Sequence, residues 1–144
     1  KIAHVVLTAN TVRTDINVLP KYREYDVVIN GRTKSTTVTL IYINNDMDGS
    51  NYESNNGTGT RLVNLFTSGN GEYFNAIAKI INAGEQGGDR VSIDARSIAI
   101  QNGYVYTGYG TYRNVSAKVN SIGIFCGSGD GVMAGTTIDI YGRM

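Results

Sequence analysis

The fold class of this chain is decided near its C-terminus, by the segment Ser121-Ile-Gly-Ile-Phe-Cys-Gly-Ser-Gly-Asp-Gly-Val-Met-Ala-Gly-Thr-Thr-Ile-Asp-Ile-Tyr-Gly-Arg-Met144. Hydrophobic residues alternate on each side of a glycine-rich turn, with Ile122 and Ile124 before it and Ile138 and Ile140 after it. Alternation with a period of two is typical of strands that bury one face. Because glycine tolerates positive φ, the segment predicts a hairpin of two strands joined by a wide turn.

Working outward from this segment, the rest of the chain shows the same short runs separated by turn signals. Dipeptides such as Asn30-Gly31, Asp48-Gly49 and Asn102-Gly103 tolerate positive φ and mark the turns. The predicted strands are Ile2–Thr8, Thr14–Val18, Glu24–Asn30, Thr36–Ile43, Arg61–Phe66, Phe74–Ile81, Arg90–Asp94, Ser97–Gln101, Val105–Tyr109, Ser121–Cys126 and Thr136–Tyr141. This succession predicts an all-β fold, an antiparallel β-sandwich of jelly-roll type.

One segment, residues 73–82, fits two kinds of secondary structure. A helix would group Phe74, Ile77 and Ile81 on one face, whereas a strand would turn Phe74 and Ile80 inward. We favour the strand because predicted strands lie on both sides.

Length and composition limit the classes of protein that the chain can represent. With 144 residues, a net charge of +1 and 17% charged residues, it fits a single domain, residues 1–144, with a sizeable core. A basic footprint for nucleic acid is missing, and no apolar run reaches the roughly 18–20 residues of a membrane span. Since the sequence starts at Lys1 without an initiator Met, we expect a C-terminal fragment of a longer chain.

Residues for catalysis are sparse. Cys126 is the only cysteine and lies in an apolar run, so we expect a small buried hydrophobe. His4 is the only histidine, no Gly-x-Ser-x-Gly motif accompanies it, and a metal site built on His and Cys is excluded. No spacing selects a pair of carboxylates for glycoside hydrolysis. The sequence therefore predicts a protein that is not an enzyme.

A calcium-loop pattern stands in the turn that contains Asp46, Asp48 and Asn51. Oxygen ligands at alternate positions with a glycine between them are what a calcium loop requires. An EF-hand would place a glutamate at its twelfth position, which here is Gly57. Two interpretations are open: a turn in which the carboxylates cap backbone amides, or a structural calcium site, with no other cofactor expected.

Tyrosine is abundant, with ten residues in the chain, and four of them fall within nine positions. Sugar rings dock on aromatic faces, and arginine and amide groups bind their hydroxyls, so this stretch predicts a glycan or receptor site. The same rings would equally suit a core or a subunit interface. The candidate residues are Tyr104, Tyr106, Tyr109, Tyr112, Arg113 and Asn114.

Three segments together resemble a β-sandwich module of tailed-bacteriophage virion proteins, found at the C-terminal tip of tail fibres or spikes. They are the opening Asp15–Pro20, the turn Asn45–Tyr52 and the ending Ala134–Gly142. The resemblance implies a non-enzymatic module on the surface of a virion. It further implies a homotrimer that contacts other virion proteins and binds a host cell-surface glycan or receptor.

Two other functions fit the same residues. A capsid decoration or cement protein would use its tyrosines and glycine-rich loops on protein interfaces, and a free-standing lectin-like module would bind carbohydrate outside any virus. For the fibre tip, we expect the loops Asn45–Asn56 and Gly127–Gly135 to lie at one end of the sandwich and to contribute contacts with the tyrosine stretch.

Overall fold

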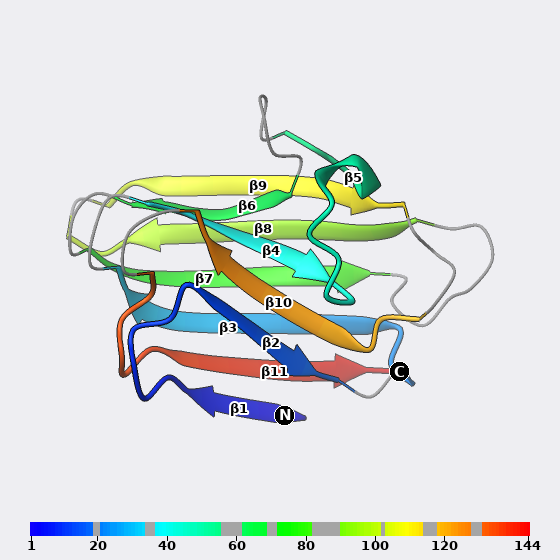
Figure 1. Cartoon of the computed structure of the whole chain (residues 1–144), viewed down its shortest axis with the longest axis horizontal. Coiled ribbons are helices and arrows are strands. Elements are labelled where there is room, and N and C mark those ends of the chain that lie inside the picture. The colour runs from blue at the N-terminus through cyan, green and yellow to red at the C-terminus, as the bar shows by residue number, and fades with distance from the viewer. Residues whose placement is uncertain are drawn as a thin grey trace.

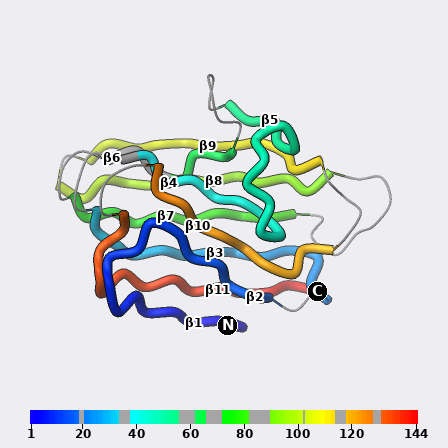
Figure 2. The backbone as a smooth tube through the Cα atoms, in the orientation of Figure 1, coloured from blue at the N-terminus to red at the C-terminus, as the bar shows by residue number. Residues whose placement is uncertain are grey.

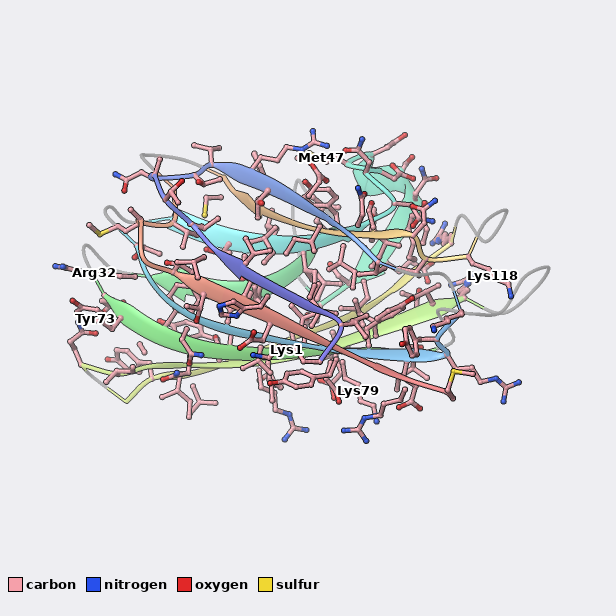
Figure 3. The ribbon with its side chains drawn as sticks, turned by 90° about the horizontal axis from the view of Figure 1, so that it is seen from below. Lys1, Arg32, Met47, Tyr73, Lys79 and Lys118 are labelled. Carbon is pink, nitrogen blue, oxygen red and sulfur yellow. The ribbon has the colours of Figure 1, made fainter. Side chains whose placement is uncertain are left out.

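The computed structural model of the chain describes residues 1–18, 21–33, 37–55, 62–68, 72–81, 90–101, 103–113, 118–127 and 131–144. These residues form two antiparallel sheets that pack face to face, as Figures 1 and 3 show from two directions. The prediction of an all-β sandwich is confirmed. Within the described ranges, no helix has the length and apolar character that crossing a membrane would require.

The larger sheet has seven strands and the smaller one has four. The large sheet contains, in spatial order, β1 (Ala3–Val6), β11 (Thr137–Arg143), β3 (Glu24–Arg32), β7 (Tyr73–Ile81), β8 (Val91–Ala99), β9 (Val105–Tyr112) and β5 (Tyr52–Ser54). The small sheet contains β2 (Arg13–Asn17), β10 (Ser121–Cys126), β4 (Thr37–Ile43) and β6 (Val63–Ser68). A single 3₁₀ turn, η1 (Gly49–Asn51), precedes β5.

The predicted C-terminal hairpin is wrong, because β10 and β11 lie in different sheets. Strand β10 pairs with β2 and β4, whereas β11 pairs with β1 and β3. Ile124 and Ile140 are both buried, as predicted, but they enter the core from opposite sheets. Alternation reveals which face of a strand is buried and carries no information on which sheet the strand joins. In Figure 2 the first and last strands run side by side, so both chain ends belong to the large sheet.

Two further differences concern the strands themselves. The predicted strands Arg90–Asp94 and Ser97–Gln101 are one continuous strand, β8, in which buried Ala95 carries the alternation past exposed charged neighbours. The short strand β5 was not predicted at all. The ambiguous segment at residues 73–82 forms strand β7, as favoured.

The core between the sheets combines aliphatic side chains with large aromatic ones. Three tyrosines, Tyr25, Tyr52 and Tyr112, are among its most deeply buried large side chains, together with Phe74, and a fourth, Tyr42, is equally buried on the outer face of the small sheet, where Arg13 covers its ring. Cys126 is buried as predicted, its thiol 3.5 Å from the Thr39 hydroxyl, and burial raises its pKa.

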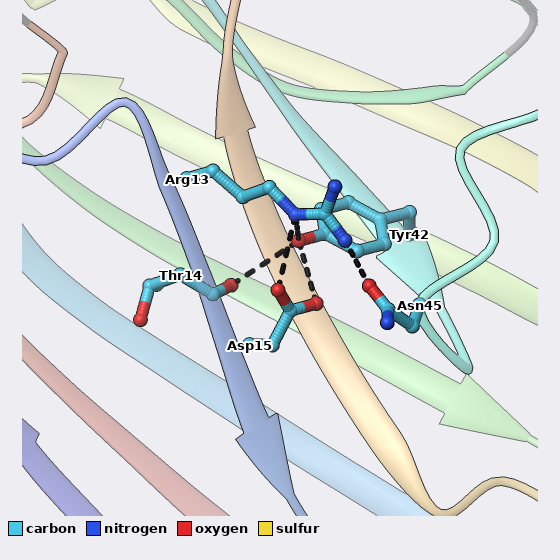
Figure 4. Close-up of polar contacts among 5 residues, drawn as sticks. All are labelled: Arg13, Thr14, Asp15, Tyr42 and Asn45. Atoms are coloured by element: carbon cyan, nitrogen blue, oxygen red, sulfur yellow. Dashed lines mark hydrogen bonds and ion pairs between the residues drawn. The ribbon is translucent and has the colours of Figure 1, made fainter.

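One tyrosine ties three strands of the small sheet together. Gly123 of β10 stands between Tyr42 of β4 and Asp15 of β2 in the ladder, and the Tyr42 ring lies across it. The Tyr42 hydroxyl donates to Asp15 Oδ1 at 2.7 Å and accepts from Arg13 Nε at 2.9 Å (Figure 4). The Arg13 guanidinium covers the ring at 5.2 Å and also donates to Asn45.

Because a Cβ atom at position 123 would lie 2.0 Å from Tyr42 Cζ, Gly123→Ala must displace the ring. We expect the variant to lose about 1–3 kcal/mol of unfolding free energy, measured by urea denaturation, as overpacked sites do. Gly127→Ala is the matched control in the same region, since its Cβ would meet only Val38 O at 3.7 Å. Equal stability of the two variants would contradict this role for Tyr42.

Candidate functional site

The structure separates the tyrosines of the predicted stretch onto two faces of β9. Tyr109 points to solvent with 59% of its surface exposed, whereas Tyr112 is 2% exposed and packs against Tyr52, with ring centroids 4.9 Å apart. The prediction that Tyr112 contacts a ligand is therefore wrong: this side chain belongs to the core, as the alternative interpretation had it.

The remaining members of the predicted set also lie apart. Tyr104, 64% exposed, precedes β9, and Tyr106 is half-buried and packs against the core. Arg113 forms an ion pair with Glu53 of β5. Asn114 lies outside the described residues. The five described members of the set thus do not form one continuous binding surface.

The turn with the calcium-loop pattern is held by hydrogen bonds from backbone amides. Asn44 and Asn45 both have positive φ, 55° and 61°, which reverses the chain after β4. Asp46 Oδ1 then accepts from the Asp48 amide at 3.0 Å, and Asp48 Oδ1 accepts from the Ser50 amide at 2.9 Å. Hydrogen bonds from Ser50 hold the pKa of Asp48 below its usual value. This is the geometry of the capping interpretation.

The second oxygen of Asp46 faces the interior of the turn. It accepts from Asn51 Nδ2 at 2.8 Å and from the buried Tyr112 hydroxyl at 3.1 Å. The Tyr52 hydroxyl donates to the Asp46 carbonyl at 2.7 Å. Asp46 therefore connects β4, β5 and β9. In the described ranges no group of three or more His, Cys, Asp or Glu side chains is placed to hold a metal ion.

Replacement of Asp46 by alanine leaves the buried Tyr112 hydroxyl without this acceptor. We expect Asp46→Ala to cost about 1–3 kcal/mol of unfolding free energy, the range for an unsatisfied buried group. Asp48→Ala, which removes only an exposed cap, should cost less.

Calcium provides the second arm of this experiment. Since both carboxylate oxygens of Asp46 already accept hydrogen bonds, we expect calcium chloride or a chelator to leave the melting temperature of the wild-type chain unchanged. A calcium-dependent rise that disappears in Asp48→Ala would instead establish the cation site.

The two loops predicted to lie together occupy opposite ends of β10. The Asn44 amide donates to Ser121 O at 2.9 Å, so the first loop adjoins the start of this strand. Gly127 follows directly on the last residue of the strand, and the described residues 131–135 continue from that end. The described parts of the two loops therefore lie at opposite ends of β10 and do not form one common site.

A surface groove lies at the latter end of the sandwich, where β3 and β7 meet the loop before β11. It has a volume of about 360 Å³ and is lined mainly by Asn30, Arg32, Tyr73, Asn75, Ile100 and Met133. Arg32 stands directly opposite Tyr73 in the β3–β7 ladder. The guanidinium lies 4.9 Å from the Tyr73 ring centre, and Figure 3 shows the two side chains together at this end. We call this feature the end groove.

The walls of the end groove are fixed by the backbone. The Met133 amide donates to Arg32 O at 2.8 Å, and the Gly135 amide donates to Leu7 O at 2.7 Å. Gly135 has φ 87°, which favours glycine. A Cβ at Gly31 would lie 2.7 Å from the Thr136 side chain, so the close approach of this loop to β3 requires glycine there.

The polar lining of the end groove comes from two amides. Asn75 Nδ2 donates to Asn30 Oδ1, and both side chains are exposed. Among the described residues, no other hydrogen bond engages Asn30 Nδ2 or Asn75 Oδ1, so the groove presents one donor and one acceptor. Sequence reasoning missed this site because its residues come from four separate segments. The only signal was the outward parity of Tyr73 and Asn75 in the predicted strand.

A second, shallower hollow of about 660 Å³ lies on the outer face of the large sheet. Its charges are paired with each other: Arg143 with Asp26 at 2.7 Å, and Lys79 with Glu24 at 3.2 Å. Beside it, exposed His4 on β1 lies 2.6 Å from Asp139. Lys1 and His4 lower the pKa of the Asp139 carboxyl. These ion pairs fasten the first strand to β11.

No protein-family model matches the chain, and a search of the curated proteins finds no match either. A function must therefore be inferred from the chain's own residues. The fold and the end groove define a β-sandwich with a preformed surface groove of aromatic and amide character.

Proposed function

We propose that this chain is a non-enzymatic binding module of a phage virion, carried at the tip of a tail fibre or spike, that attaches to glycans of the host surface. The observation that carries the proposal is the end groove, in which an exposed tyrosine, an arginine and two asparagines converge. Convergence of a few polar groups on an apolar wall is typical of small-molecule binding sites.

Carbohydrate suits this lining better than other ligands do. Tyr73 is half exposed, and beside it Ile100 extends the apolar wall on which a sugar ring can rest. Sugar hydroxyls both donate and accept hydrogen bonds, and the Asn30–Asn75 pair offers one group of each kind.

The guanidinium of Arg32 adds a preference within this class of ligand. It is held over the Tyr73 ring, so its position is set before a ligand arrives. Because a guanidinium matches the geometry of carboxylate and phosphate groups, we expect acidic glycans to bind more tightly than neutral ones.

The virion setting rests on the sequence resemblance and on the winding of the chain. We infer a jelly-roll winding from the strand orders β1-β11-β3-β7-β8-β9-β5 and β2-β10-β4-β6, because strands β1 to β7 alternate between the two sheets and β9 to β11 do so again. Jelly rolls are common in viral and lectin domains. The resembling segment Ala134–Gly142 also forms part of the groove wall before it enters β11.

A capsid decoration protein is the second candidate, and one observation favours it. The outer face of the large sheet exposes Ile77, Ile98 and Val105, which are the side chains of a protein interface rather than of a sugar site. Tight binding of the chain to empty phage capsids, with no binding to glycans, would support this role.

A glycan array, followed by calorimetry with the best soluble oligosaccharide, tests the proposal. We expect Tyr73→Ala and Arg32→Ala each to weaken binding about tenfold or more, since each removes a wall of the groove. Binding of the Arg32 variant should fall most for acidic glycans.

Tyr104→Ala is the matched control, because Tyr104 is even more exposed and belongs to the originally predicted stretch. It should bind like the wild type. Loss of binding in Tyr104→Ala with full binding by Tyr73→Ala would move the site to β9. Circular dichroism of each variant checks that the fold is intact.

A further inference from the structure

The outer face of the large sheet carries an apolar area centred on β8. Ile98 stands opposite Val105 in the β8–β9 ladder, and Tyr109 stands opposite Asp94. Between half and two thirds of the surface of each of these apolar side chains is exposed to solvent. The β8 face, as we call it, consists of Ile77, Asp94, Arg96, Ile98, Val105 and Tyr109.

Two opposite charges stand in the middle of this apolar area. Asp94 and Arg96 are exposed on the same side of β8, one on each side of inward-pointing Ala95. Neither forms an ion pair with any other described residue. Lys79 is opposite Asp94 in the ladder, but its ammonium group lies 3.2 Å from Glu24. Elsewhere on this outer face the carboxylates of Asp26 and Asp139 have cationic partners within the chain.

We propose that the β8 face binds a second copy of the chain across a twofold axis that lies in the interface, passes over Ala95 and crosses the strands. Such an axis places the two β8 strands antiparallel, one above the other. Asp94 of each copy then faces Arg96 of the other, so that two ion pairs form by symmetry. Reciprocal contacts of this kind define an isologous interface.

The geometry of sheet packing is compatible with this arrangement. Stacked sheets lie about 10 Å apart with their strands crossing at about 30°. Residues nearest the crossing point keep their partners despite the twist, and Asp94 and Arg96 are the outward residues nearest to Ala95. Their long or charged side chains can bridge such a gap from both sides.

The surroundings of the charges explain why the pairs would be specific. Ile77 and Ile98 flank Arg96, and Tyr109 flanks Asp94, so a stacked copy would exclude water from the ion pairs.

A second copy fits this face better than an unrelated partner does. A face that binds its own copy must carry charges of both signs at positions that the twofold axis exchanges. Asp94 and Arg96 satisfy this condition, because they lie on either side of Ala95. Binding to an unrelated partner would not require this symmetric placement of opposite charges. The proposal rests on none of the groove's residues, but Asn75 of the end groove stands opposite Ile98 in the β7–β8 ladder, so dimer formation and glycan binding in the groove would compete.

Light scattering after size exclusion tests the proposal through charge reversal. The wild-type chain should have a mass of about twice 15.5 kDa. Arg96→Asp and Asp94→Arg should each be monomeric at the same concentration, because like charges then meet across the axis. The two single variants should form a dimer with each other when mixed, and the double variant should form a dimer alone.

Lys118→Asp, an exposed charge reversal at the far end of the sandwich, is the matched control and should remain a dimer. A monomeric wild type would overturn the proposal. A three-chain mass that survives in both single variants would overturn it as well and would support the homotrimer expected from the sequence. Far-UV circular dichroism spectra of all variants should match that of the wild type, since both side chains are exposed.

Discussion

The structure depends on one constraint, which is that each buried phenol must find a hydrogen-bond partner. Burial raises the pKa of all four buried tyrosines, to about 12 for Tyr25, so their hydroxyls stay protonated and act as donors. An unpaired hydroxyl at such a depth would cost about 1–3 kcal/mol. The acceptors are the Asp15 carboxylate for Tyr42, the Asp46 backbone carbonyl for Tyr52 and the Asp46 carboxylate for Tyr112. The buried tyrosines therefore require two carboxylates, Asp15 on the edge strand β2 and Asp46 in the turn after β4.

This constraint joins the calcium-loop pattern to the tyrosine stretch. Asp46 accepts from amides of its own turn with one oxygen and from Tyr112 with the other, so the two motifs are two halves of one junction. A local pattern of carboxylates resembles a cation site because both arrangements need convergent oxygens. The donor that reaches the Asp46 oxygens comes from β9, more than sixty residues away in the chain. The sequence of the turn alone therefore cannot reveal it.

The sequence predicted the class of fold and most buried positions, because alternation survives wherever inward residues are apolar. The sequence did not reveal which face of β9 is buried. The inward residues of this strand are Tyr106, Gly108, Gly110 and Tyr112. A Cβ at Gly108 would lie 1.7 Å from Asn64 O, so glycine is required where the sheets approach. Two inward glycines remove the hydrophobic signal, while Val105 and Tyr109 on the outward side imitate it. The end groove was missed for another reason, since the pairing of Arg32 with Tyr73 exists only in the β3–β7 ladder.

The same ladder prepares the end groove for the binding proposed above. Backbone pairing places these residues side by side, Arg32 packs on the Tyr73 ring and Asn75 donates to Asn30, so little side-chain entropy is lost when a ligand binds. In the proposed role, an open groove of this size would make few contacts, so we expect binding through one copy to be weak. Attachment to a glycan-covered surface would then gain strength from simultaneous binding by several copies of the chain rather than from further contacts within each groove.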